Sequence, residues 1–558
     1  MSRRAKLGRS TAILFAALSL SAIGWSVQAE VRLAPASLHA IAKVDPRFQS
    51  YNIEMAEVIG GRFWAPYPKP GAPATGSGGP KSGGVDLAAG MFRKREPLNL
   101  MANRRLLNLA KALGPSYIRI GGAWANTAWF QDDDAPQQQT PPTGYQGVLT
   151  RGQWAGVVQF AKATDAKIIT SFGVSPGARD ANGVWNPDNA RKLVRYTKSL
   201  GGQIYGAELI NEPNVGPMVG LPKGYDAASF ARDDAVFEAF LKQETPEAKS
   251  VGPASTGEAG FMLFPKTPGS IDTAALMSAE PKPQFDIFAY HFYGAVSQRC
   301  AGMGKDAGIS PDKALSEDWL ARTDRAYDYY KALHDRFTPG APIWVTEAAE
   351  AACGGDAWAT TWLDTFRYVD QMGRLARRNV AAIFHNTLSA SDYALIDDQT
   401  WRPRPSYWAA LLWRRLMGDV VLDAGPIQPG LHVYAQCLRD SPGGVAIVAI
   451  NLDRSKPGVL RLPTAAQRYT LTADELQSGT VKLNGRALAL ASDDQIPSLR
   501  SAPTAAGRLR LAPASITFLA VAGARNPACR LAVVARSPAG AMPAAPGRAA
   551  ERRPSRDG

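Results

Sequence analysis

Helix-like and strand-like segments alternate along the greater part of this chain, from about residue 100 to 415. Stretches with apolar residues at helical spacing, such as 98–113 and 405–417, are separated by short apolar runs, such as 117–120 and 381–385. Repeated alternation of this kind predicts an α/β fold and favours a (β/α)8 TIM barrel. A doubly wound sheet is the alternative, but no G-x-G-x-x-G follows the first strand, which weakens a dinucleotide-binding interpretation.

A different pattern follows residue 418, where short apolar/polar alternating runs are separated by turn residues. Runs at 431–438, 445–451 and 516–521 predict strands of an accessory C-terminal β-sandwich domain. The extended segment after the leader is expected to join that sandwich. The predicted domains are a signal peptide (1–29), an N-terminal strand segment (30–48), the (β/α)8 barrel (49–416), the β-sandwich (417–530) and a disordered basic tail (531–558).

The first 29 residues have the pattern of a secretory leader. Four basic residues precede the apolar run Thr11–Trp25, and small residues end the segment at Ala29. The run is shorter than the roughly 18 apolar residues that span a bilayer. We therefore expect cleavage after Ala29, no membrane anchor, and a secreted or periplasmic protein.

The net charge of +14 suggests a polyanion-binding protein until its location is considered. Four of these charges lie in residues 1–29, and a net five lie in 525–558, which is rich in Pro, Ala and Arg. The +5 that remains over 30–524 is mild for a segment of that length. This balance is compatible with an acidic substrate, and nucleic acid is not expected as a partner.

Four cysteines lie in the part expected to be exported: Cys300, Cys353, Cys437 and Cys529. An even number in an oxidising compartment predicts disulfides, and three pairings are open. No C-x-x-C and no paired Cys/His spacing occurs, so neither a metal site nor a cofactor is expected.

Two glutamates stand where barrel strands are expected to end, the edge at which barrel active sites lie. Glu212 follows the predicted strand 203–210, and Pro213 stops that strand. Glu347 follows the predicted strand 343–346. Strand alternation places each glutamate on the same face as the residues two and four positions before it.

Two carboxyl groups that face each other across a barrel mouth suit the hydrolysis of a glycosidic bond. One is protonated and assists the departing oxygen, while the other is ionised and attacks the anomeric carbon or activates water. Each charge raises the pKa of the other group, which keeps one proton bound near neutral pH. A structural role or an ion pair is the alternative, but Asn211 beside Glu212 can position a sugar hydroxyl, which favours catalysis.

Asn211-Glu212-Pro213-Asn214 resembles the acid/base motif of the clan A retaining (β/α)8 glycosidases. More narrowly, the chain resembles the heparanase and β-glucuronidase family, glycoside hydrolase family 79. The matching stretches cover most of residues 44–530 in order. They include Val44-Asp45-Pro46-Arg47-Phe48, Ser116-Tyr117-Ile118-Arg119-Ile120-Gly121-Gly122, Trp185-Asn186-Pro187-Asp188, Asp392-Tyr393-Ala394-Leu395 and Leu431-His432-Val433-Tyr434.

The resemblance implies a secreted, retaining β-glucuronidase with Glu212 as the acid/base and Glu347 as the nucleophile, their carboxyl groups about 5–5.5 Å apart. The substrate-binding residues implied in the same way are Glu54, Asn211, Tyr293, Cys353, Gly354 and Tyr393. Glu54 would bind glycone hydroxyls, Asn211 the 2-hydroxyl, and Tyr293 would orient the nucleophile. Tyr393 and the backbone at Cys353–Gly354 would hold the uronic acid carboxylate.

Cys353 stands where family members often have glycine. The loops that bear Cys300 and Cys353 should be neighbours in a barrel, so a disulfide beside the site is expected, with a reduced Cys353 as the alternative. The resemblance then implies a Cys437–Cys529 bridge in the sandwich.

The expected substrate is a heparan-sulfate-like polysaccharide or a smaller glucuronide, and endo or exo action stays open. The basic cluster 92–95 either holds a sulfated chain or forms a solvated charged turn. Two alternative functions are a retaining glycosidase of the same clan with a neutral glycone, and a non-catalytic polyanion- or carbohydrate-binding protein. We expect a monomer.

Overall fold

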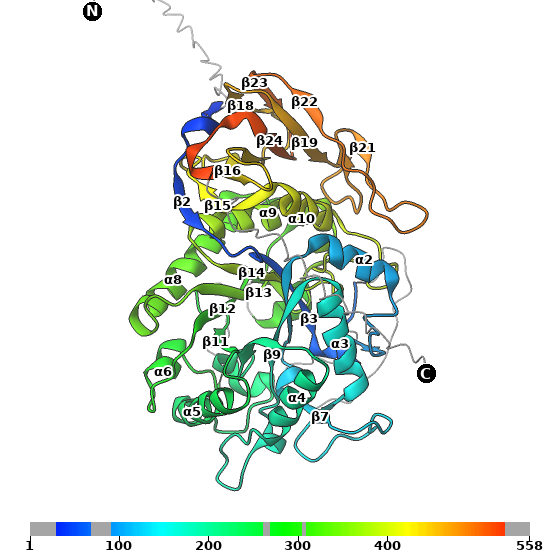
Figure 1. Ribbon diagram of the computed structural model, residues 1–558, viewed down its shortest axis with the longest axis vertical. Coiled ribbons are helices and arrows are strands. Elements are labelled where there is room, and N and C mark those ends of the chain that lie inside the picture. Colours follow the sequence, from blue (N-terminus) through cyan, green and yellow to red (C-terminus); the bar gives the residue numbers. More distant parts are fainter. Residues whose placement is uncertain (1–29, 68–90, 260–267, 304–307, 531–558) are drawn as a thin grey trace, which may run out of the picture.

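A computed structural model describes residues 30–67, 91–259, 268–303 and 308–530 (Figure 1). The predicted signal peptide (1–29) and basic tail (531–558) lie outside the described residues. Within the described part, no helix is long and apolar enough to cross a membrane.

Eight parallel strands close into a barrel, so the predicted (β/α)8 fold is confirmed and the doubly wound alternative is wrong. Each strand pairs with the next along the chain, and β14 returns to pair with β3, which leaves the sheet without an edge. The strands are β3 (Gln49–Glu54), β6 (Ser116–Gly121), β9 (Ala166–Ser171), β10 (Ile204–Glu208), β11 (Lys249–Ser255), β12 (Ile287–Val296), β13 (Ile343–Ala352) and β14 (Ala382–His385).

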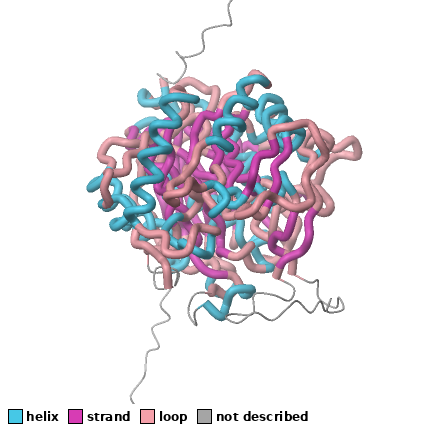
Figure 2. Tube along the Cα trace, turned by 90° about the horizontal axis from the view of Figure 1, so that it is seen from below, coloured by secondary structure: helices cyan, strands magenta, loops and turns pink. Residues whose placement is uncertain are grey.

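Helices surround these strands (Figure 2). They are α2 (Arg104–Leu113), α3 (Arg151–Ala163), α4 (Asp188–Ser199), α5 (Ala227–Glu244), α6 (Thr273–Ser278), α8 (Arg322–Phe337), α9 (Trp362–Arg377) and α10 (Pro405–Leu416). Local sequence explains their starts: Thr150 and Gln153 form a reciprocal capping box at α3, and the Asp226 side chain accepts from the Ser229 amide at α5.

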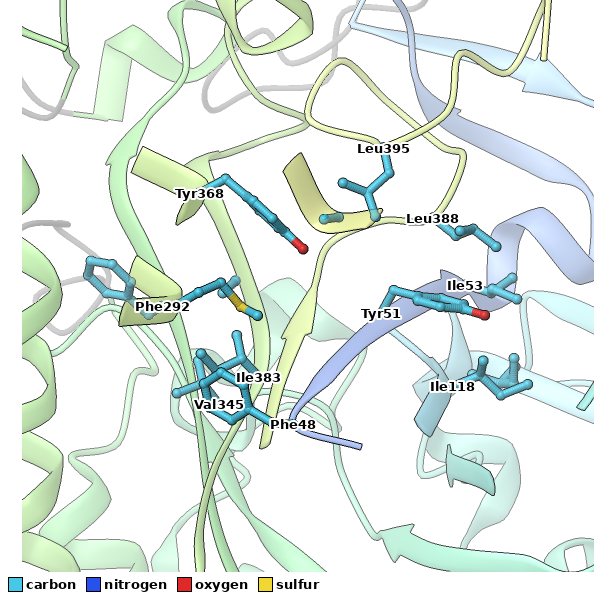
Figure 3. Close-up of a cluster of buried hydrophobic side chains, with 14 of the residues drawn as sticks. Phe48, Tyr51, Ile53, Ile118, Phe292, Val345, Tyr368, Ile383, Leu388 and Leu395 are labelled. Atoms are coloured by element: carbon cyan, nitrogen blue, oxygen red, sulfur yellow. The ribbon is translucent and has the colours of Figure 1, made fainter. Parts of the chain in front are cut away.

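The barrel strands bury both faces. Inside, an apolar layer closes the lower part of the barrel, where Tyr117, Trp344 and Phe384 pack with ring centroids 4.7–5.9 Å apart. Outside, residues of β3, β13 and β14 surround Tyr368 of α9 (Figure 3). Inside the barrel, the polar side chains that could form a site therefore lie above this apolar layer, toward the carboxyl ends of the strands.

The predicted accessory β-sandwich is also confirmed. Antiparallel strands form one nine-stranded sheet, and a second, three-stranded sheet lies against it. The first contains β2 (Ala40–Lys43), β15 (Met417–Leu422), β16 (Leu431–Leu438), β17 (Val445–Asn451), β19 (Ala466–Thr472), β20 (Lys482–Leu483), β21 (Arg486–Ala487), β22 (Ala502–Thr504) and β24 (Ser515–Val521); the second contains β1 (Glu30–Arg32), β18 (Gly458–Leu462) and β23 (Gly507–Leu511).

Alternate residues of β17 join the sandwich to the barrel. Ile447 faces the three-stranded sheet, while Val448 and Ile450 belong to the apolar core shared with α9 and α10. The chain before the barrel takes part as well, because β1 pairs with β18 and β2 pairs with β15. The Cys437–Cys529 disulfide links β16 to the end of the sandwich.

Candidate active site

Glu347 enters the barrel through an irregularity in β13. The strand continues to Ala352 instead of ending at Thr346, and Val345 pairs with Tyr290 while Glu347 pairs with His291. Thr346 is thus an extra residue, a β-bulge. The prediction that Glu347 shares a face with Val345 is wrong: Val345 packs toward the helices, and the bulge turns Glu347 into the barrel.

Glu212 reaches the same cavity by a turn. Strand β10 ends at Glu208, and Glu212 has left-handed backbone angles (φ 53°, ψ 55°) directly before the short helix η4 (Pro213–Val219). The prediction that Glu208 and Glu212 share one strand face is therefore wrong. Asn126 holds the turn, since its side chain accepts from the Asn211 amide at 2.9 Å and donates to the carbonyls of Asn211 and Val219.

A buried arginine connects the two halves of the site. The side chain of Arg119 on β6 is fully buried and donates to both oxygens of Glu208 at 2.8–2.9 Å. It also donates to Glu347 Oε2 at 2.9 Å and to Asn211 Oδ1 at 2.8 Å. The full countercharge from Glu208 makes the burial of this guanidinium tolerable. Sequence reasoning missed Arg119, although a lone cation within an apolar strand is itself a signal.

Glu212 and Glu347 face each other with a histidine between them. One oxygen of each carboxyl group and a ring nitrogen of His291 lie within 4.8 Å of one another. His291 Nδ1 is 3.0 Å from Glu212 Oε1 and 3.7 Å from Glu347 Oε2. Burial lowers the pKa of His291 to about 4, so the ring is neutral at physiological pH.

The proton of the pair belongs to Glu212. Burial raises its pKa to about 7, and the charge of Arg119 opposes that rise. The expected cause of such a shift was the charge of the facing carboxylate, Glu347; burial is the main cause instead, with a smaller contribution from Glu208. Glu347 by contrast accepts hydrogen bonds from Arg119, Tyr293 and Asn386, a set of donors suited to a carboxylate.

Hydrogen bonds from Asn386 order two tyrosines near Glu347. The Asn386 side-chain amide donates to Tyr293 Oη at 2.8 Å and to Tyr393 Oη at 3.1 Å, and Tyr293 in turn donates to Glu347 Oε1. Because each tyrosine oxygen accepts from Asn386, its own O–H is directed elsewhere. Sequence reasoning identified both tyrosines and missed Asn386.

Glu54 lies at the end of β3 with a carboxylate oxygen that has no hydrogen-bond partner among the described residues. Burial raises its pKa, and the charge of Glu347 adds to the rise. Gly122 has φ +84°, and a Cβ there would lie 1.7 Å from Glu54 Oε2, so only glycine leaves room for this side chain. An unpartnered acceptor facing a cavity suits a ligand hydroxyl.

The turn after β13 has three successive left-handed residues: Cys353 (φ 63°), Gly354 (φ 80°) and Gly355 (φ 78°). The amides of Cys353 and Gly354 donate to no other described residue. On the opposite side, Arg299 donates to the carbonyls of Cys353 at 3.1 Å and Gly355 at 2.6 Å. Free amides on one side of such a turn form an anion-binding surface.

The expected disulfide beside the site is present, joining Cys300 to Cys353. Both cysteines line a cavity of about 420 Å³ together with Glu212 and Glu347. Of the predicted substrate-binding residues, Gly354 alone is not among those that line it. The others that do are Glu54, Asn211, Tyr293 and Tyr393.

Glu212, His291 and Glu347 also have the spacing of metal ligands. Arg119 already supplies a positive charge to Glu347 Oε2, which disfavours a second cation at the same oxygen. The arrangement is better suited to proton transfer and nucleophilic attack on a bound sugar.

Comparison with known proteins agrees with this chemistry. Residues 90–373 match the model of "Glycosyl hydrolase family 79, N-terminal domain". The chain is 25% identical over 495 residues to Heparanase-like protein 1 of Arabidopsis thaliana, covering 77% of this chain and 87% of that one. It is 25% identical over 469 residues to Baicalin-beta-D-glucuronidase of Scutellaria baicalensis, with coverages of 76% and 84%. Mouse heparanase (Mus musculus) is 24% identical over 498 residues, with coverages of 77% and 88%.

Solved structures show the same fold at lower identity. A 4-O-alpha-L-rhamnosyl-beta-D-glucuronidase from Fusarium oxysporum superposes with a TM-score of 0.58 at 12% identity, covering 88% of this chain and 99% of that one. A family 51 arabinofuranosidase from Xanthomonas axonopodis pv. citri superposes with a TM-score of 0.56 at 14% identity and the same coverages. These likenesses concern the fold alone.

Proposed function

The chain belongs to glycosyl hydrolase family 79, and from that premise we propose that it is a retaining β-glucuronidase. Glu212 is the acid/base and Glu347 the nucleophile. The observation that carries the proposal is the pair itself, with carboxyl oxygens within 4.8 Å of each other across one cavity. Inverting enzymes need about 6.5–9.5 Å to admit a water molecule between the groups, so the short separation supports retention.

In the first step, Glu347 attacks the anomeric carbon while protonated Glu212 donates its proton to the glycosidic oxygen. The bond to the leaving group breaks, and a glycosyl ester forms on Glu347. In the second step, Glu212 removes a proton from water, which attacks the same carbon and releases Glu347 as a carboxylate. A pKa of about 7 for Glu212 suits both the donation and the removal of a proton.

The groups around Glu347 support both steps. Arg119 and Tyr293 hold its two oxygens and stabilise the carboxylate that leaves at the end of the cycle. The neutral ring of His291, whose Nδ1 is 3.0 Å from Glu212 Oε1, can accept a hydrogen bond from protonated Glu212 or donate one to its carboxylate without adding charge.

The glycone is assigned to glucuronic acid from the turn after β13. The amides of Cys353 and Gly354 and the hydroxyl of Tyr393 would bind the sugar carboxylate, an anion site without a mobile side-chain charge. Glu54 would accept from glycone hydroxyls, and Asn211 would contact the 2-hydroxyl. The names of the heparanase and glucuronidase relatives support the same sugar.

We also propose that the protein is exported by the leader 1–29 and acts as a secreted or periplasmic enzyme. The two disulfides support an oxidising compartment. We propose the domain limits as a barrel over 49–416 and a sandwich over 417–530 with 30–48 joined to it. The pairing of β1 with β18 and of β2 with β15 supports the joining of 30–48.

The assignment is tested with 4-nitrophenyl β-D-glucuronide. Glu347→Gln should abolish turnover while the circular dichroism spectrum and Tm stay close to those of the wild type. With added azide, Glu212→Ala should form the β-configured glucuronyl azide, and Glu347→Ala the α-configured one, because azide replaces water in one variant and the nucleophile in the other. Unchanged turnover by Glu347→Gln, or activity on a neutral aryl glycoside alone, would refute the proposal.

A further inference from the structure

The segment that follows Glu212 contributes apolar side chains to the wall of the cavity. Because Glu212 must contact the glycosidic oxygen, the leaving group lies beside this residue and the segment that follows it. That segment, η4, contributes Val215, Pro217 and Met218 to the cavity lining. Met218 is 49% exposed, the highest value among the exposed large hydrophobic residues of the described chain. An exposed apolar side chain at a cavity rim is suited to contact with a ligand.

Three half-buried aromatic rings form another part of the lining: Trp64, Phe92 and Trp124. Trp64 and Phe92 stack with centroids 4.6 Å apart, and Phe92 meets Trp124 edge-on at 6.4 Å. Trp124 is fixed from behind by Phe63 at 4.7 Å. Trp64 lies next to the proposed uronate turn, since a Cβ at Gly354 would be 2.7 Å from Trp64 Cβ, and Trp124 is at the other end of this row of rings. Rings that already hold one another in place can receive a flat apolar group at a low cost in side-chain ordering.

Three carboxyl groups line this cavity, those of Glu54, Glu212 and Glu347, and no lysine or arginine is among its described lining residues. A sulfate group bound beside Glu212 would lose water without gaining a counter-ion. Arginine and lysine are the side chains that most often supply such a counter-ion to phosphate and sulfate groups.

The basic cluster of β5 (Phe92–Arg95) does not supply the missing cations. Arg93 and Arg95 both pair with Asp398, on the side of the strand away from Phe92. Lys94 is paired with Glu96 in open solvent, where both side chains are at least 80% exposed. The interpretation of this cluster as a site for a sulfated chain therefore loses its support.

We infer that the group released from the sugar is uncharged and apolar or aromatic, and that it is not a sulfated sugar of a heparan-sulfate-like chain. The inference rests on the proposed β-glucuronidase activity and narrows it to one class of substrate. The difference in specificity between this enzyme and one that degrades sulfated polysaccharide would then lie in the part of the cavity that binds the leaving group, rather than in the part that binds the uronate.

A matched pair of substrates tests the inference: 2-naphthyl β-D-glucuronide and 6-sulfo-2-naphthyl β-D-glucuronide, which differ only in one sulfonate. We expect kcat/KM to be at least 30-fold higher for the unsulfonated compound. The electron-withdrawing sulfonate makes naphthol a better leaving group, so chemistry alone would favour the other order. Equal values, or a preference for the sulfonated compound, would overturn the inference. Hydrolysis of neither would overturn the β-glucuronidase activity and the inference with it.

Variants at Met218 test the place of the leaving group. Met218→Lys adds a cation beside η4 at an exposed position, and it should shift the ratio of the two kcat/KM values at least tenfold toward the sulfonated compound. Met218→Leu is the matched control, and the ratio should stay within twofold of the wild type. A Met218→Lys enzyme with an unchanged ratio would contradict the placement of the aglycone against η4.

Discussion

At the scale of single residues, the site depends on which of two similar carboxyl groups keeps a proton. Glu212 has a side chain only 17% exposed and lies next to a neutral histidine, whereas Glu347 receives three hydrogen-bond donors. The two environments differ in the way that the proposed roles of acid for Glu212 and nucleophile for Glu347 require.

The pH dependence follows from the pKa of Glu212. With 4-nitrophenyl β-D-glucuronide, kcat/KM should fall about tenfold per pH unit above about pH 7, because the carboxyl group must be protonated to assist departure and its pKa is raised to about 7. A 2,4-dinitrophenyl glucuronide needs little protonation and serves as the control. Its kcat/KM should lose much less across the same range; parallel losses for both substrates would argue against Glu212 as the acid.

Position along a predicted strand was not enough to identify several residues of the site. Arg119 and Asn386 contribute through side chains that converge from β6 and the end of β14. Asn126 acts through the backbone of a turn. The two glutamates, Glu54, Tyr293 and Tyr393, which were named from motifs of the family, line one cavity; their roles stay proposals.

At the scale of elements, irregular backbone does what regular strands cannot. Without the bulge at Thr346, alternation would place Glu347 among the residues that face the helices. Asn52 of β3 donates to the Thr346 carbonyl at 3.2 Å, so a neighbouring strand supports the bulge. A bulge has no signature in hydrophobic periodicity. The sequence therefore predicted a strand followed by Glu347, but it did not predict that a bulge turns the Glu347 side chain into the barrel.

Helix α5 and strand β11 were not predicted, and for α5 the sequence explains why. Buried Asp233 and Asp234 interrupt the apolar face of α5. Asp233 is compensated by Arg179 and by the hydroxyl of Tyr225, partners that are distant in sequence or lie in a loop. Periodicity cannot register a buried polar residue whose partner is supplied by the tertiary fold.

The turn that holds the proposed anion site is an element supported from behind by Arg299. The double variant Arg299→Gln/Asp392→Asn removes this support without leaving one buried charge unpaired, because Asp392 is the ion-pair partner of Arg299. We expect KM for aryl glucuronide to rise about tenfold, equivalent to about 1.4 kcal/mol, with a smaller change in kcat.

The control for that variant is Arg105→Gln/Asp494→Asn, which removes an arginine–aspartate pair that does not contact the turn and whose members form no other ion pair among the described residues. Its KM should stay close to that of the wild type. A KM for the Arg299 double variant that matches the control would show that the turn does not depend on Arg299 for its conformation.

At the scale of the whole molecule, a buried polar cluster joins the sandwich to the barrel. His432 on β16 bonds to Asp370 of α9 at 2.6 Å and to Glu317 of α7 (Glu317–Leu320) at 3.0 Å. The two carboxylates raise the pKa of His432 to about 9 against the opposing effect of burial, and His432 and Arg374 lower that of Asp370 to about 2.

This cluster should make stability depend on pH. His432 has a raised pKa in the folded state, so its contribution is complete below about pH 6.5 and is lost as pH rises toward about 9. The free energy of unfolding should fall by an amount on the order of 3 kcal/mol over that range. His432→Gln should be less stable at pH 6 and should show a flatter pH profile; urea unfolding of both proteins at pH 6, 7.5 and 9 measures this. Equal slopes for the two proteins would rule the cluster out as the cause.

The course of the chain through the sandwich has a consequence for biosynthesis. Strands β1 and β2 are made first, yet they pair with β18 and β15, which are made after the entire barrel. The barrel is in this sense an insertion between the first and the later strands of another domain. During translation, the edges of strands β1 and β2 in residues 30–43 therefore stay unpaired until the ribosome has released the C-terminal part. A nascent chain stopped near residue 416 would expose those edges to other chains.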